Sequence, residues 1–198
     1  MVKPMASPWP VHDPPFLTFL FSDVRSGWLW LVLRLYVGWK WLEAGLQKWE
    51  PGWLEQGTAF ERMLERALAT SSADGPFVAF EWYRRAIGYV LHTDAYVWLA
   101  RVVVAAEIAV GIGLIVGLLV GVTALLAAFM SWNAVMAGFV GANSLLLPLA
   151  LLLVFAWKVA GYIGCDYFLL PRLFGPSRQD PQQLHTMTRY PPHFSGRM

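Results

Sequence analysis

Long apolar runs alternate with shorter polar connections along most of this chain. The runs cover residues 28–49, 95–119, 122–140 and 145–170. A helix needs about 20 predominantly apolar residues to cross the hydrocarbon core of a bilayer, and each run comes near to that length or exceeds it. The pattern therefore predicts an all-α integral membrane protein whose lipid-embedded part is a four-helix bundle within residues 27–171.

The segments outside the runs have patterns of their own. Residues 1–26 are rich in proline and predict an irregular N-terminal arm, and residues 172–198 predict a polar C-terminal tail. The connection 51–93 contains two amphipathic stripes at helical spacing, which are formed by Phe60, Met63, Leu64, Ala67 and Leu68 and by Phe80, Tyr83, Ile87 and Val90. We expect these two helices to lie on the membrane surface or to cap the bundle.

The first apolar run carries charges among its tryptophans and leucines. Tyr36, Lys40, Glu43 and Gln47 share one helical face, whereas Arg34, Gly38, Trp41 and Gly45 share roughly the opposite face. Charges at membrane depth are costly and persist mainly where they face other protein or water. Because a helix surrounded by lipid would not be polar on two sides, we expect this helix to be packed between neighbours.

The other runs carry complementary groups at similar depth, if each helix rises about 1.5 Å per residue. We expect Glu43 to pair with Arg101, and Glu107 to pair with Lys158 or Arg34. Such charges either fix the register of the helices or line a polar pocket. In a pocket, the candidate catalytic residues are Glu107, Lys158 and Glu43, and the candidate ligand-binding residues are Arg34, Tyr36, Lys40, Arg101, Trp132, Asn133 and Tyr162. The excess positive charge favours a small anion or the developing oxyanion of a quinol, and the spacing does not choose between them.

Composition narrows the class of protein. Hydrophobic residues make up 57% of the 198 and charged residues 14%, whereas soluble domains have about 25% charged residues. The 11 tryptophans suit two aromatic belts at the membrane interfaces. A net charge of +2 with scattered basic residues argues against a nucleic-acid partner. The basic residues near the runs favour cytoplasmic termini.

Cysteine and histidine exclude several kinds of redox chemistry. Cys165 is the single cysteine, so no internal disulfide and no dithiol mechanism is available. The four histidines lie in the arm, the tail or at the boundary of a run, and no His or Cys pair has metal-ligand spacing. We therefore expect neither haem nor a bound metal.

Several stretches resemble the DoxX/DoxD family of membrane proteins. They are RLYVGWKWLEAGLQK at 34–48, Glu107 followed by VGIGL at 110–114, WN at 132–133 with AG at 137–138, and AWKVAGYIGCD at 156–166 with LLP at 169–171. The resemblance runs from about residue 27 to residue 172. It departs from the family pattern at Lys158, where the family has an arginine after the tryptophan.

The resemblance implies a four-helix membrane protein with a redox role. DoxD-type members are a subunit of thiosulfate:quinone oxidoreductase, which passes electrons from thiosulfate to a membrane quinone and forms tetrathionate. On that basis we expect quinone as cofactor, a protein partner subunit or a homo-oligomer, and a location in the cytoplasmic (inner) membrane of a prokaryote. Two alternatives stay open: a non-catalytic accessory subunit of a larger respiratory or photosynthetic complex, and a pathway for a small solute or anion.

Overall fold

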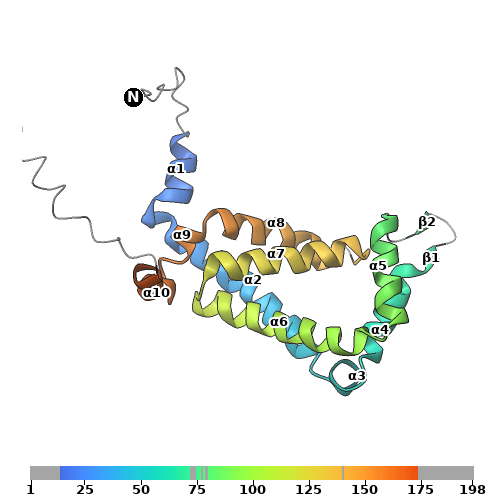
Figure 1. Ribbon diagram of the computed structural model, residues 1–198. Coiled ribbons are helices and arrows are strands. Elements are labelled where there is room, and N and C mark those ends of the chain that lie inside the picture. Colours follow the sequence, from blue (N-terminus) through green and yellow to red (C-terminus); the bar gives the residue numbers. More distant parts are fainter. Residues whose placement is uncertain (1–13, 72–74, 77, 79, 140, 174–198) are drawn as a thin grey trace, which may run out of the picture.

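The computed structural model describes residues 14–71, 75–76, 78, 80–139 and 141–173. Within these residues the fold is all-α, apart from a short antiparallel pair of strands, β1 (Thr70–Ser71) and β2 (Gly75–Pro76). Four helices lie lengthwise side by side (Figure 1), namely α2 (Gly27–Gln47), α6 (Tyr96–Val116), α7 (Val120–Met136) and α8 (Gly141–Phe155). Helix α2 packs on α6 and α7 on α8, and contacts of α6 with α7 and of α2 with α8 join the two pairs. The predicted all-α architecture is confirmed.

The remaining helices lie at the two ends of this bundle (Figure 1). At one end are α3 (Pro51–Leu54), α4 (Thr58–Leu68) and α5 (Glu81–His92), and at the other are α1 (Pro15–Ser22), the 3-10 helix η1 (Val24–Ser26), α9 (Trp157–Ala160) and α10 (Asp166–Leu173). Helices α4 and α5 are the two amphipathic helices that the stripes in 51–93 predict. Helix α4 buries Phe60, Leu64 and Ala67, and α5 buries Ile87. Of the predicted arm, residues 1–13 lie outside the described residues, whereas α1 and η1 make most of 14–26 helical and not irregular as predicted. Of the predicted tail, residues 174–198 lie outside the described residues.

Helix α2 buries the face that contains Arg34, Gly38, Trp41 and Gly45. On the facing helix α6, a Cβ added at Gly111 would lie 2.6 Å from the backbone nitrogen of Leu42 and 2.8 Å from its Cα. Only glycine lets the two backbones come this close, so the α2–α6 contact depends on the absence of a side chain at this position.

A tight turn joins α6 to α7. Gly117 ends α6 with a φ of 74°, and the backbone N–H groups of Gly117 and Leu118 both donate to the carbonyl of Gly113, at 2.9 and 2.8 Å. This is the hydrogen-bonding pattern of a glycine that terminates a helix. Because Leu119 provides no side-chain cap for α7, Asp166 does so from the far end of the chain: its carboxylate accepts the backbone N–H of Leu119 at 2.6 Å and of Val120 at 2.8 Å.

The predicted fourth helix, 145–170, is not continuous. Helix α8 ends at Phe155, and α9 and α10 follow as separate short helices. Between them the backbone N–H of Cys165 donates to Val116 O at 3.3 Å and that of Asp166 to Gly117 O at 2.9 Å. These bonds direct the chain across the end of α6, which a continuous helix would not allow. The apolar pattern continues through the break, so hydrophobicity alone did not reveal it.

Among the described residues, α6 is the one helix that is both long and apolar enough to cross a membrane, with a mean hydropathy of 2.2 in its best 18-residue window. The segment Pro15–Ser22 with Val24–Gln47 meets the same criteria as a pair of helices bent by 65°. The apolar helices Val120–Met136 and Ser144–Phe155 are shorter. Four full membrane spans stay a prediction.

Candidate functional site

A cavity of about 810 Å³ lies between the bundle and the two amphipathic helices. Its walls come mainly from α2, α4, α5, α6 and α7, and most of the side chains that line it are apolar. Small-molecule sites in proteins have volumes of about 300–1,000 Å³ and combine apolar walls with a few polar groups. The cavity has the size and the lining of such a site.

An ion pair between Lys48 and Glu107 forms part of its wall. Lys48 Nζ lies 2.5 Å from Glu107 Oε1 and 2.7 Å from Oε2, and the two side chains are 22% and 8% exposed. The same ammonium lies 5.4 Å from the centroid of the Trp53 ring, a distance at which a cation is attracted to an aromatic face. The charge of Lys48 is therefore held at the cavity by a carboxylate and an indole.

A second ion pair on the cavity wall joins Lys40 to Glu43 at 2.8 Å. Both side chains are more than a third exposed, 41% and 38%, so solvent screens this pair more than the first. The predicted pair of Glu43 with Arg101 is wrong. Arg101 instead donates to the backbone carbonyls of Leu54 and Glu55 at 2.6 and 2.9 Å, because the end of α3 presents carbonyls that need donors.

Tyr83 and Asn133 connect α5 to α7 across the cavity wall. The Tyr83 hydroxyl donates to the Asn133 backbone carbonyl at 3.0 Å and lies 3.4 Å from its side-chain oxygen. Burial raises the pKa of the Tyr83 phenol above its ordinary value of 10.0. The phenol therefore stays protonated at neutral pH and fixes one end of α5 to the bundle.

Four of the candidate residues from the sequence thus line the cavity: Lys40, Glu43, Glu107 and Asn133. The others do not. Arg34 is buried and donates to Ala160 O at 2.7 Å and Ile163 O at 2.8 Å, carbonyls at the break between α9 and α10. Tyr36, Trp132 and Tyr162 are exposed on the outside of the bundle.

The predicted pairing of Glu107 with Lys158 or Arg34 is wrong. Lys158 is exposed on α9 and lies over the Trp157 ring, 5.7 Å from its centroid. Helix α9 lies at the end of the bundle away from α4 and α5 (Figure 1). The prediction placed Lys158 near the middle of a fourth helix over 145–170, whereas α8 ends at Phe155 and Lys158 lies beyond that end.

Sequence reasoning missed Lys48, Tyr83 and Trp41 as cavity residues. A usable signal existed for Lys48, because it follows Arg34, Gly38, Trp41 and Gly45 at the next helical step on the buried face. Tyr83 was already part of the predicted apolar stripe, where its hydroxyl marks it as the member that needs a hydrogen-bond partner.

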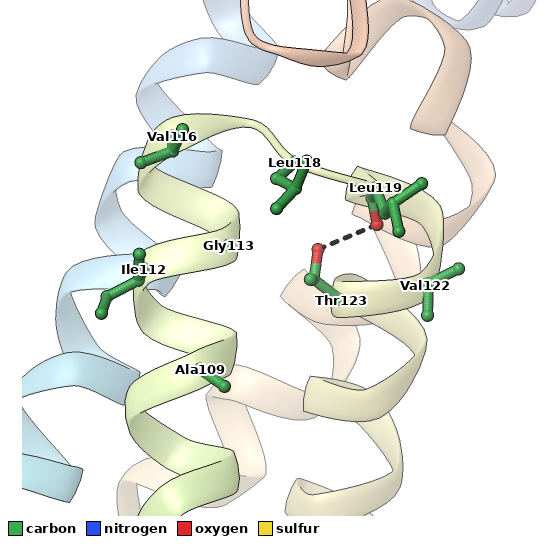
Figure 2. A pocket seen from close by; sticks show the side chains of 8 residues that line it. All are labelled: Ala109, Ile112, Gly113, Val116, Leu118, Leu119, Val122 and Thr123. Carbon is green, nitrogen blue, oxygen red and sulfur yellow. Dashed lines mark hydrogen bonds between the residues drawn. The ribbon is translucent and has the colours of Figure 1, made fainter. Parts of the chain in front are cut away.

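A smaller cavity of about 250 Å³ lies where α6 turns into α7, and Figure 2 shows the side chains around it. Among the described residues that line it, Thr123 has the one polar side chain, and its hydroxyl donates to Leu119 O at 3.1 Å and to Val120 O at 3.2 Å. This second cavity has apolar walls and a hydroxyl that is already bonded, so the larger cavity is the candidate site.

No group of three or more His, Cys, Asp or Glu within the described part of the chain could hold a metal ion. The polar groups at the large cavity are instead suited to an organic molecule with hydrogen-bonding groups on an apolar body. Comparison of the whole chain with family models, with curated proteins and with solved structures gives no match.

Proposed function

We propose that this protein is an integral membrane protein that binds a quinone in the cavity between the bundle and helices α4 and α5. In this proposal it is the redox subunit that links oxidation of a thiosulfate-like sulfur compound to the membrane quinone pool, with a partner protein that binds the sulfur compound. The observation that carries the proposal is the cavity itself. Its apolar walls suit a quinone ring, and its polar groups suit the ring oxygens.

The surface supports a membrane location. Large apolar side chains are exposed along the whole bundle, among them Trp28, Val32, Val122, Leu125 and Phe155. Contiguous exposed apolar surface of this kind is rare on soluble monomers and marks contact with lipid or protein. Exposed aromatic residues also gather around the end with α3, α4 and α5, namely Trp49, Trp82, Tyr89 and Trp98, as expected of an interfacial belt. An inner membrane of a prokaryote with cytoplasmic termini remains part of the proposal.

The charged side chains at the cavity would act on a bound molecule in two ways, by stabilising charge on its oxygens and by holding a proton near them. A bound quinone supplies the redox chemistry, because it takes up two electrons and two protons as two thiosulfate ions lose two electrons and join as tetrathionate. Lys48 places a cation beside the cavity, where it would favour negative charge on a ligand oxygen. Glu107, opposite Lys48, is the carboxylate nearest to that charge and the candidate for holding a proton there.

Quinone binding to the full-length protein in lipid nanodiscs tests the proposal. Decylubiquinone is titrated into the wild type and into two variants of α6, with empty nanodiscs as background. Ala106→Phe fills the cavity, because Ala106 lines it, whereas Ala105→Phe places the same ring on the exposed neighbouring position. We expect at least a tenfold loss of affinity for Ala106→Phe and wild-type affinity for Ala105→Phe.

Two outcomes would contradict the proposal. One is a wild type that binds no quinone, or binds it equally well with the cavity filled. The other is stable co-purification with a large respiratory or photosynthetic assembly without quinone at this subunit, which would favour the accessory-subunit function.

A further inference from the structure

The large cavity reaches the outer surface of the bundle between α6 and α7. At the turn that joins these helices they are in close contact, since a Cβ added at Gly113 would lie 2.6 Å from Thr123 Cγ2. Towards the end with α3, α4 and α5 the two helices diverge (Figure 1), and side chains of both line the cavity. Val102 of α6 and Leu126 and Phe129 of α7 line it and are also exposed, at 51%, 39% and 57%. These three side chains form the α6–α7 mouth of the cavity.

The α6–α7 mouth is apolar, whereas the wall formed by α2 is polar where it is exposed. The lining of α2 exposes Gln47 and part of the side chains of Lys40 and Glu43. Among the described residues of α6 and α7 that line the cavity, the exposed ones are the three apolar residues of the mouth. Val122 and Leu125 extend the exposed apolar surface of α7, which in a membrane protein is surface in contact with lipid. The mouth therefore opens towards hydrocarbon.

A ligand that fits both the cavity and its mouth has two chemically different parts. The ion pair of Lys48 and Glu107 at the cavity wall suits a head with oxygen atoms. A polar group placed in the mouth would lose its hydrogen bonds to water and gain none from the three side chains there. A hydrocarbon chain loses nothing, because it passes from lipid to side chains that are equally apolar.

We propose that the cavity takes a quinone with a long hydrocarbon chain, which enters sideways from the bilayer and whose chain lies in the α6–α7 mouth while the ring occupies the cavity. The inference rests on the proposed function and adds the class of quinone and the route by which it enters. The mouth acts by leaving room for the chain. Closing it should therefore affect a quinone with a chain and spare the same ring without one.

The test compares two quinones with the same ring, decylubiquinone and the chain-free 2,3-dimethoxy-5-methyl-1,4-benzoquinone. Both are titrated into the full-length wild type, Leu126→Trp and Leu125→Trp in lipid nanodiscs. Leu126→Trp narrows the mouth, whereas Leu125→Trp places the same ring on the neighbouring exposed residue, which does not line the cavity. Each quinone partitions into the same lipid in every sample, so a change of affinity between variants reports on the protein.

We expect Leu126→Trp to weaken decylubiquinone about fivefold or more, the size of a moderate steric conflict, and to leave the affinity for the chain-free ring unchanged. Leu125→Trp should leave both affinities unchanged. Val102→Trp narrows the mouth from the α6 side and should repeat the result of Leu126→Trp. Because both mouth residues are exposed, the midpoint of thermal unfolding should stay near that of the wild type, and this measurement is made on every variant.

The outcomes separate this inference from the proposed function. If both mouth variants weaken the two quinones equally, the mouth contacts the ring and the chain lies elsewhere, so the inference fails. If neither variant weakens decylubiquinone, the chain does not use the mouth, and a lipid acyl chain is the candidate occupant. A wild type that binds the chain-free ring but not decylubiquinone would overturn the class of quinone alone. A wild type that binds neither would overturn the proposed function itself.

Discussion

Lys48 at the end of α2 and Glu107 in the middle of α6 form a two-oxygen ion pair, with Nζ–O distances of 2.5 and 2.7 Å. The pair ties the longest packed helices to each other at the wall of the large cavity. Its two members are unequally buried, at 22% and 8% exposure. The carboxylate is thus the group that depends more on its partner.

Removing the lysine of this pair should lower the free energy of unfolding more than removing the glutamate. Lys48→Met strands the buried Glu107 carboxylate, whereas Glu107→Gln leaves an ammonium that reaches solvent more easily. We expect both to lower the free energy of unfolding, by less than the roughly 3–5 kcal/mol of a fully buried pair, with Lys48→Met the larger loss. Denaturant titration of the purified protein in detergent measures the order.

Two controls are available. One is the double variant Lys48→Met with Glu107→Leu, and the other is the more exposed pair of Lys40 and Glu43. The double variant should recover much of the loss, because neither charge is left unpaired. Lys40→Met should change the unfolding midpoint little. If Glu107→Gln lowered the free energy of unfolding more than Lys48→Met, Glu107 would not be the more buried member of the pair.

Arg34 should be essential to the fold and Lys158 dispensable. Arg34→Met leaves the carbonyls of Ala160 and Ile163 without their donor in a buried site, and we expect a loss of about 3 kcal/mol. Arg34→Lys should rescue little of this loss, because one ammonium does not reproduce the fork of a guanidinium. Lys158→Met should leave the thermal midpoint and quinone binding unchanged. Weaker quinone binding by Lys158→Met, with an unchanged thermal midpoint, would mean that Lys158 belongs to the binding site.

Gly111 and Gly88 offer a matched test of helix packing. A Cβ at Gly111 meets the backbone of Leu42 at 2.6–2.8 Å, whereas a Cβ at Gly88 on α5 has nothing within 4 Å. Gly111→Ala should therefore force α2 and α6 apart and cost about 2–3 kcal/mol. Gly88→Ala should raise stability by roughly 0.5–1 kcal/mol, because alanine loses less backbone entropy in a helix. Equal effects of the two substitutions on the unfolding midpoint would argue against the α2–α6 contact.

Tyr83 should make stability fall at alkaline pH. Its pKa is raised in the folded state by burial, so the folded protein holds the phenol proton more tightly than the unfolded chain does. The contribution of this group is complete below the unfolded pKa of about 10 and is lost as pH rises through the higher folded pKa. Tyr83→Phe should remove that part of the decline and cost about 1 kcal/mol at neutral pH, since it removes the bond to Asn133.

The control for Tyr83 is Tyr89 on the same helix, whose ring is exposed. Unfolding midpoints are measured between about pH 8 and about pH 12, a range that brackets the ordinary tyrosine pKa of about 10 and extends above it. Tyr89→Phe should follow the wild type across the series. An alkaline decline in Tyr83→Phe as steep as that of the wild type would show that other groups cause it.

Local pattern determined the helices of this protein and which side of several of them is buried. The apolar runs anticipated α2, α6 and α7, because hydrophobic residues at helical spacing need one face covered. The stripes around Phe60 and Ile87 anticipated α4 and α5 for the same reason. The face of Arg34 and Trp41 was separated correctly from that of Tyr36, since helical periodicity is a property of the sequence itself.

Only the tertiary structure decided which charged groups meet between different helices. The segment between α9 and α10 is held against the end of α6 by hydrogen bonds from the backbone N–H groups of Cys165 and Asp166, which no apolar count contains. Helix α8 ends at Phe155, so Lys158 lies beyond it on α9, and Glu107 pairs with Lys48. Pair formation depends on differences of a few ångströms in helix register and side-chain reach, because Coulomb energy changes steeply at short distance. The sequence therefore determined that polar groups are buried in this bundle, and the packing of its helices determined the partners and the cavity that they line.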